Sequence, residues 1–231
     1  MLLQRSGGRG SKYAKKIDPI TMHIAYEGKE DEKEYFEAFS SKLSKRFRNT
    51  VRLIAVPKTT SASAPETVKN DLVAHLKKNR INLTRTKSHM GFIVIDKDHF
   101  FSKQHQRSTW ATIADCNKRG ITVLCSNPCF EIWLLCHYLD VASQSEKFKN
   151  DALRNKKANK NSKSYLKAQV AKFRKGEDVD AMLDRIEYAY NNEAKLKNIS
   201  KDPHKLPPDD LVSNVGVIVK YLLDNGIPLF K

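Results

Sequence analysis

Short apolar runs alternate with longer amphipathic stretches from about residue 21 to residue 138, and this alternation limits the fold more than any other feature. The stretches between the runs favour helices at about 31–46, 65–78 and 106–118. Strands that alternate with helices are typical of βαβ units around a largely parallel sheet. We therefore predict an α/β fold with a central, mainly parallel four-stranded sheet flanked by helices. The four runs of strand length are TMHIAY (21–26), VRLIAV (51–56), GFIVID (91–96) and ITVLCS (121–126).

The rest of the chain favours helices. SNPCFEIWLLCHYL (126–139) predicts an apolar helix with Ser126 or Asn127 as its N-cap and Pro128 in its first turn. Helices are also expected within 163–173, 178–196 and 209–225. We expect three parts: a basic N-terminal arm (1–19), an α/β domain (20–140) and a basic, mostly helical C-terminal extension (141–231).

The charge of the chain is strongly positive. It has 42 Lys and Arg against 26 Asp and Glu, a formal net charge of +16. Residues 1–16 carry basic residues and no acid, and residues 147–175 carry eleven basic residues against the single Asp151. Such segments favour a polyanion partner, with nucleic acid ahead of an anionic membrane surface. The alternative is that both are solvated segments that only aid solubility.

The four cysteines, Cys116, Cys125, Cys129 and Cys136, lack the paired spacing of most zinc sites. We expect reduced core thiols, which are typical of a cytoplasmic chain. A zinc site built from Cys125, Cys129 and His137 is the alternative. The N-terminus has basic residues without an apolar segment after them, so we expect no signal peptide, and the absence of a long apolar run predicts no membrane span.

Three acidic residues follow the ends of two predicted strands. Glu27 directly follows the first strand, Asp96 ends the third, and Asp98 comes two residues later. Because the carboxyl ends of parallel strands meet at one edge of a sheet, these side chains are expected to lie together. Like charges repel unless a cation neutralises them, and oxygen ligands favour Mg²⁺ or Mn²⁺. The pattern predicts a divalent-metal site, and the alternative for Asp-Lys-Asp is a solvated turn.

Glu131 lies inside an otherwise apolar stretch, where a carboxylate is costly without a partner. It follows the fourth predicted strand, so we assign it to the same acidic group, and the alternative is a place on the solvent side of the helix. Glu30, Glu32 and Glu34 lie near the start of a predicted helix, where the helix dipole favours acids.

Three motifs, IAYEGKEDEKEYF, GFIVIDKDHF and SNPCFEIWLLCHY, together resemble the RloB-like proteins over roughly residues 20–140. The glutamate followed by Asp-x-Asp is similar to the Toprim catalytic domain of topoisomerases, primases and OLD-type nucleases. The resemblance implies a Toprim-like, Rossmannoid domain and a Mg²⁺-dependent nuclease. Its metal ligands would be Glu27, Asp96 and Asp98, with Glu131 as a further catalytic acid. The family usually has Thr-Glu soon after its E-G, where this chain has Asp31 and Glu32, so a ligand role for Glu30 or Glu32 stays open.

The resemblance also implies a biological setting. Members occur with an ATPase of the ABC or OLD type in bacterial anti-phage defence, including abortive infection, and related Toprim effectors are toxic RNases that can cut tRNA. We therefore expect an ATPase partner and either RNA or DNA as substrate. Two alternatives are a non-catalytic, metal- and nucleic-acid-binding regulatory module of such a complex and a primase-like nucleotidyl transferase that uses the same acids.

Other side chains have expected roles around this site. Glu131, or Glu27 with a single metal ion, is expected to orient or deprotonate water. Phe36, Phe39, Phe92 and Trp133 have core spacing, so only Phe100 and Phe101 are candidates for contact with a base. The candidates for phosphate contacts are Lys97 and His99 at the strand edge and Lys156, Lys157, Lys160 and Lys163 in the second basic segment.

Overall fold

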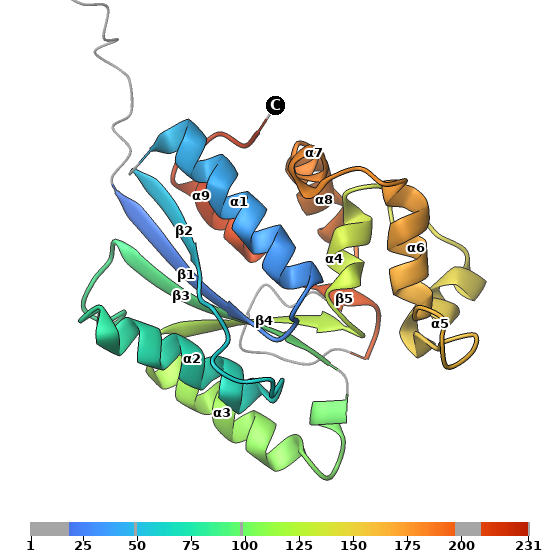
Figure 1. Cartoon of the computed structure of the whole chain (residues 1–231), viewed down its shortest axis with the longest axis horizontal. Helices are drawn as coiled ribbons and strands as arrows, with labels where there is room; N and C mark the ends of the chain where they lie inside the picture. Colours follow the sequence, from blue (N-terminus) through green and yellow to red (C-terminus); the bar gives the residue numbers. More distant parts are fainter. Residues whose placement is uncertain (1–18, 49, 98, 197–208, 231) are drawn as a thin grey trace, which may run out of the picture.

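The computed structural model describes residues 19–48, 50–97, 99–196 and 209–230, with His99 described by its backbone alone. A mostly parallel five-stranded sheet lies at the centre of this part (Figure 1), in the order β2-β1-β3-β4-β5. The first four strands pair in parallel, and β5 pairs antiparallel with β4. The strands are β1 (Ile20–Tyr26), β2 (Val51–Ala55), β3 (His89–Asp96), β4 (Ile121–Asn127) and β5 (Val212–Ser213).

Helices cover both faces of the sheet. Two of them, α2 and α3, lie on one face, while α1, α4, α8 and α9 lie on the other (Figure 1). The predicted α/β fold is confirmed, and the first three predicted helices agree with the structure to within one residue. The helices are α1 (Asp31–Phe47), α2 (Pro65–Lys78), α3 (Gln106–Lys118), α4 (Glu131–Cys136), α5 (Glu146–Arg154), α6 (Tyr165–Arg174), α7 (Val179–Leu183), α8 (Ile186–Glu193) and α9 (Val217–Asp224), with a short 3₁₀ turn at His99–Phe101.

The side chains of β3 show how one strand serves two cores. Phe92 and Val94 belong to the larger hydrophobic cluster, whereas Ile93 and Ile95 belong to the cluster under α2 and α3. A strand buried on both faces reads as a continuous apolar run because successive side chains point to opposite sides. By the same alternation Asp96 falls on the face of Phe92 and Val94, which is the face that α4 covers.

The prediction for the start of α4 is wrong. Ser126 and Asn127 remain in β4, because their backbones pair with Ser213 and Val212 of β5. The Asn127–Pro128 peptide bond is cis, and α4 begins three residues after the proline, with Phe130 as its N-cap. The fifth strand was missed because a two-residue strand carries no apolar pattern of its own.

Two predicted C-terminal helices are also only partly correct. The 178–196 segment divides into α7 and α8, and the 209–225 segment contributes β5 before α9 begins. Asn214 extends this pairing, since its side-chain Oδ1 accepts a hydrogen bond from the backbone N–H of Cys125 at 2.6 Å. Edge pairing with β4 therefore competes with helix formation in the 209–225 segment.

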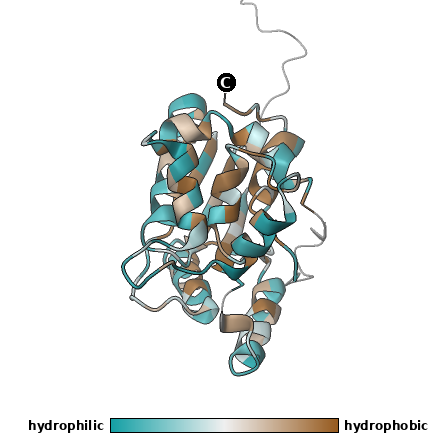
Figure 2. Cartoon of the chain, turned by 90° about the vertical axis from the view of Figure 1, so that its right-hand side faces the viewer, coloured by the Kyte–Doolittle hydropathy of each residue, from teal (hydrophilic) through white to brown (hydrophobic). Residues whose placement is uncertain are grey.

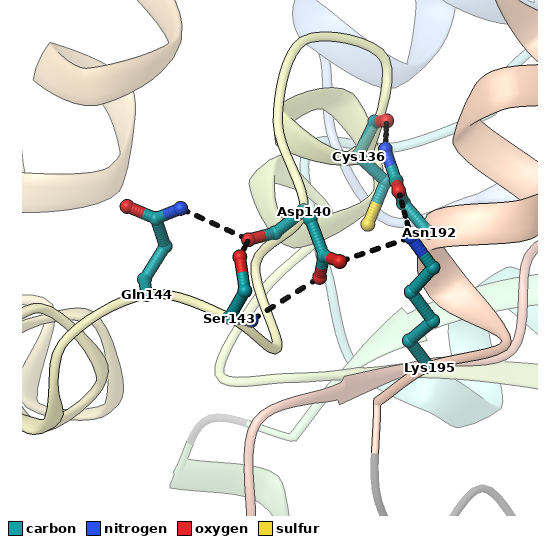
Figure 3. Close-up of polar contacts among 6 residues, drawn as sticks. All are labelled: Cys136, Asp140, Ser143, Gln144, Asn192 and Lys195. Atoms are coloured by element: carbon teal, nitrogen blue, oxygen red, sulfur yellow. Dashed lines mark hydrogen bonds and ion pairs between the residues drawn. The ribbon is translucent and has the colours of Figure 1, made fainter.

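Contacts cross the predicted domain boundary at residue 140, and the boundary itself stays a prediction. Asn192 of α8 donates a hydrogen bond to the carbonyl of Cys136 at 2.9 Å, and Lys195 pairs with Asp140 at 2.9 Å (Figure 3). The hydrogen bond from Lys195 holds the pKa of the Asp140 carboxyl below its usual range. In Figure 2 the helices carry brown, hydrophobic residues among teal, hydrophilic ones. The larger core draws such residues from both sides of the boundary.

Candidate active site at the carboxyl edge of the sheet

Two of the predicted metal ligands lie on neighbouring parallel strands. Glu27 directly follows β1, and Asp96 ends β3, which pairs with β1. The Glu27 Oε2 atom accepts a hydrogen bond from the backbone N–H of Asp96 at 3.1 Å. The Asp96 Oδ1 atom accepts one from the backbone N–H of Phe130, at the start of α4, at 2.9 Å. Backbone donors therefore orient both carboxylates, as a rigid acidic site requires.

The third predicted ligand, Asp98, and the side chain of His99 lie outside the described residues, so their roles stay predictions. Among the residues that are described, no three His, Cys, Asp or Glu side chains come close enough together to hold a metal ion. Glu27 and Asp96 nevertheless supply the oxygen donors that Mg²⁺ and Mn²⁺ prefer.

The alternative zinc site does not form. Cys125 packs in the cluster under α2 and α3, while Cys129 packs in the larger cluster on the opposite face. The His137 Nδ1 atom faces the carbonyl of Trp133 at 3.1 Å, and Nε2 faces the hydroxyl of Tyr35 at 3.3 Å. All four cysteines are buried and none is in a disulfide, which confirms the prediction of core thiols.

Glu32, whose role the sequence left open, lies close to the strand-end acids. Its side chain is only 7% exposed, and its Oε1 atom accepts a hydrogen bond from the backbone N–H of Gly28 at 3.0 Å. A Cβ atom on Gly28 would lie 1.7 Å from Glu32 Oε2, so any other residue here would displace the Glu32 carboxyl. Burial raises the pKa of Glu32 to about 7, and the charges of Glu131 and Asp31 add to the rise. Burial at this position therefore favours the protonated form of the carboxyl.

Glu131 is the first residue of α4 and is also 7% exposed. Its Oε1 atom lies 3.7 Å from the ammonium group of Lys167, which belongs to α6. The same ammonium group lies 3.0 Å from Asp31 Oδ2. Burial lowers the pKa of Lys167, but its hydrogen bond to Asp31 and the nearby acids outweigh that effect and raise the pKa overall. Lys167 thus places a fixed positive charge beside the acids.

A pocket of about 560 Å³ lies beside Asp96, and Glu27 is not among its lining residues. Three acids line it, Glu32, Asp96 and Glu131, together with three cations, Lys97, Arg154 and Lys167. The acids come from a strand end and from the first turns of α1 and α4, while Arg154 and Lys167 come from α5 and α6. The rest of the wall is formed by Gly28, Asn127, Pro128, Cys129, Leu153, Asn155 and Ser164.

The predicted phosphate-contacting lysines have different surroundings. Lys97 pairs with Asp209 at 2.8 Å and lines the pocket. Lys163 lines a second pocket, of about 360 Å³, that also includes Glu131 and Lys167. Lys156, Lys157 and Lys160 are exposed in the loop between α5 and α6. Phosphate contacts by these lysines stay predictions, and residues 1–16 lie outside the described part of the chain.

Several predicted core residues are confirmed. Phe36, Phe39, Phe92 and Trp133 are at most 1% exposed.

Burial, followed by the charges of Glu131 and Asp96, raises the pKa of the Cys129 thiol well above its usual value, so this thiol stays protonated. No helix in the described ranges is long and apolar enough to cross a membrane.

The RloB-like protein family matches residues 22–222, a span that includes the sheet, the pocket and the helices after residue 140. The chain belongs to this family. No curated protein and no solved structure matches the chain. This is the same family that the three sequence motifs resemble.

Three features of the RloB-like pocket were not predicted. Lys167 and Arg154 reach it from the C-terminal part, and their positions follow from tertiary packing. Lys58, in the loop after β2, donates to the backbone carbonyl of Glu27. The spacing of Gly28 and Glu32 was the one sequence signal available for this site. A glycine followed four residues later by an acid allows the acid, in the first turn of α1, to accept a hydrogen bond from the glycine at the end of β1.

Proposed function

We propose that this RloB-like chain is a Mg²⁺- or Mn²⁺-dependent Toprim-type nuclease that hydrolyses phosphodiester bonds in RNA or DNA. The observation that carries the proposal is the hydrogen bond between Glu27 and the backbone of Asp96, which holds two acids at the carboxyl edge of a parallel sheet. Ligands and catalytic groups collect at this edge in open α/β sheets. Glu32 and Glu131 lie around the same opening, and cations from α5 and α6 face them.

The donor set fits a hard divalent cation. Glu27 and Asp96, with Asp98 two residues further along, would hold it, and Glu32 is a further carboxylate within the same site. When bound, the cation supplies positive charge that offsets the negative charge of phosphodiester hydrolysis. Glu131 orients or deprotonates the attacking water, and Glu27 does so if only one ion binds. Glu131 Oε1 lies 3.7 Å from the ammonium group of Lys167, which places a positive charge beside it.

The basic residues hold the substrate by its phosphates. Lys97 and His99 act next to the acids, and Lys156, Lys157, Lys160 and Lys163 act along the second basic segment. The formal charge of +16 supports a nucleic-acid substrate, including tRNA. We further propose that the chain is the toxic effector of a bacterial anti-phage, abortive-infection system. It would act in the cytoplasm with an ABC- or OLD-type ATPase, which co-purification of the two proteins would test.

The test compares purified wild type with Asp96→Asn on RNA and DNA in the presence of Mg²⁺ or Mn²⁺. Asparagine keeps an oxygen that accepts from the Phe130 N–H, so the start of α4 stays capped while the charge is lost. Wild type is expected to cleave at least one polymer, and Asp96→Asn is expected to lose the activity by about 1,000-fold or more. Asp115→Asn is the matched control, because Asp115 lies on α3 and pairs with Lys69 and Arg119.

Equal behaviour of wild type and Asp96→Asn on every polymer would overturn the nuclease proposal. The second candidate, a non-catalytic metal- and nucleic-acid-binding regulatory module, would then apply if both proteins still bind nucleic acid and the ATPase. The formal charge of +16 supports nucleic-acid binding by this candidate as well.

A further inference from the structure

A chain of pockets runs from the acids along α6. The pocket that contains Asp96 shares Glu131 and Lys167 with the second pocket, which extends past Lys163 to Arg174. Arg174 and Gly176 also line a third pocket, of about 880 Å³. Neighbouring pockets thus share lining residues, and we call the three together the α6 groove, with Lys167, Arg174 and Tyr188 on its wall.

One side of α6 places two cations on this groove, whose second pocket is also lined by the acids Glu30, Asp31, Glu131 and Glu177. Lys167 and Arg174 lie seven residues apart, which is close to two helical turns and places them on one side of the helix. Their rise along the helix is roughly 10 Å. Two cations on one side of a helix can therefore contact different phosphates of the same polynucleotide.

The cations already have acidic neighbours, but these pairs are weak. Lys167 pairs with Asp31 at 3.0 Å, and Arg174 pairs with Glu34 at 3.0 Å. Glu34 and Asp31 are 53% and 32% exposed, so both pairs are open to solvent. Exposed ion pairs contribute little to stability, and a phosphate forms stronger bonds with a guanidinium group. A polyanion can therefore replace Asp31 and Glu34 without a large penalty, whereas the contact of Lys167 with the buried Glu131, at 3.7 Å, remains.

The far end of the groove is aromatic. Tyr138, Phe173 and Tyr188 line the third pocket together with Arg174, Lys175 and Arg185, against the single acid Glu177. The guanidinium group of Arg185 lies 4.8 Å from the centre of the Tyr138 ring and occupies one aromatic surface. Tyr188 is 47% exposed, so part of its aromatic side chain is open to solvent.

We propose that the α6 groove holds a single-stranded stretch of nucleic acid, with phosphates on Lys167 and Arg174 and a base stacked on Tyr188. This inference rests on the proposed nuclease function and names its substrate class. Aromatic side chains stack on unpaired bases, whereas the bases of a duplex are already stacked on one another. A polar groove that ends in an exposed aromatic side chain therefore fits a single strand better than a duplex.

The test measures binding by fluorescence anisotropy in the Asp96→Asn background with EDTA, using a labelled single strand of about 12 nucleotides, as RNA and as DNA, and the matching duplex. The single strand is expected to bind at least about 10-fold more tightly than the duplex. Tyr188→Ala is expected to lose about 10-fold in affinity for the single strand, and Tyr188→Phe is expected to keep it. Trp110→Ala is the matched control, because Trp110 is an exposed aromatic residue on α3.

A second measurement uses the salt dependence of the affinity to count phosphate contacts. Arg174→Gln is expected to reduce the slope of log affinity against log salt by about 0.7, the value for one phosphate contact on a single strand. Arg119→Gln removes a similarly paired arginine on the far side of the molecule and is expected to leave the slope unchanged.

Three outcomes would overturn the proposal that the α6 groove holds a single strand. They are equal affinities for Tyr188→Ala and Trp110→Ala, equal binding of duplex and single strand, and no binding at all. If wild type still cleaves with Mg²⁺ in any of these cases, the groove fails while the nuclease function stands. If Asp96→Asn cleaves like wild type but the binding differences appear, the nuclease site fails while the groove stands.

Discussion

Residues 20–140 and the described residues after 140 form two walls around the acidic site and the α6 groove, and they do so in different ways. The first region places its acids at strand ends and helix starts, where backbone N–H groups fix Glu27, Glu32 and Asp96. The second region places Lys167 and Arg174 on one helix, where exposed ion pairs hold them. Rigid acids suit bond-breaking chemistry, and exchangeable cations suit the binding of a long polyanion. Changes in the first wall should therefore reduce kcat, and changes in the second should raise KM.

The largest effect is expected from Glu131→Gln. Glutamine keeps the shape of the buried side chain but can neither accept a proton from water nor carry the charge that Lys167 faces. We expect kcat for cleavage to fall by about 1,000-fold, with little change in KM. Glu187→Gln, an exposed change on α8, is the control. A loss in KM alone would place Glu131 in the binding wall.

Gly28→Ala tests whether the position of Glu32 matters. The new methyl group would occupy the place of the Glu32 carboxyl and push it away from the site. We expect a fall in kcat of about 100-fold, as for other small displacements of catalytic groups, while the melting temperature changes little. Lys29→Ala, at the next and exposed position, should leave kcat unchanged. An active Gly28→Ala enzyme would show that Glu32 only caps the turn.

Low pH should reduce the stability of the folded chain through His137. Complete burial lowers the pKa of His137 from 6.5 to about 3, so below pH 6.5 the unfolded chain takes up a proton that the folded chain excludes. Stability is therefore lost as the pH falls, by about 2 kcal/mol at pH 5, which is about 30-fold in the folding equilibrium. Denaturant unfolding at pH 7 and pH 5 should show a smaller drop for His137→Gln than for wild type. His105→Gln, an exposed change, should show the full drop.

The smallest effect is expected from Lys167→Ala. Loss of one charged contact to phosphate should raise KM by about 10-fold and change kcat less. The control is Lys172→Ala, on the same helix but outside the pockets that Lys167 lines. If Lys167→Ala lowers kcat and leaves KM unchanged, Lys167 acts on Glu131 and not on the substrate.

The regular part of the chain could be predicted closely because local patterns decide it. The four longer strands and the first three helices follow from apolar runs and helical spacing, and the parallel register places Glu27 beside Asp96. The start of α4 and the strand β5 could not be predicted, because both depend on pairing between Asn127 and Val212, far apart in the sequence. Glu32 and Lys167 depend on tertiary contacts in the same way, with Gly28 as the only local signal.

The most direct test of the central claim is expression of wild type beside Asp96→Asn in cells, followed by sequencing of cleaved RNA and DNA ends. We expect toxicity and a set of new ends in RNA or DNA with wild type, and neither with Asp96→Asn. The polymer that carries the ends identifies the substrate. The same ends at the same abundance in both strains would contradict a catalytic site at the carboxyl edge of this sheet.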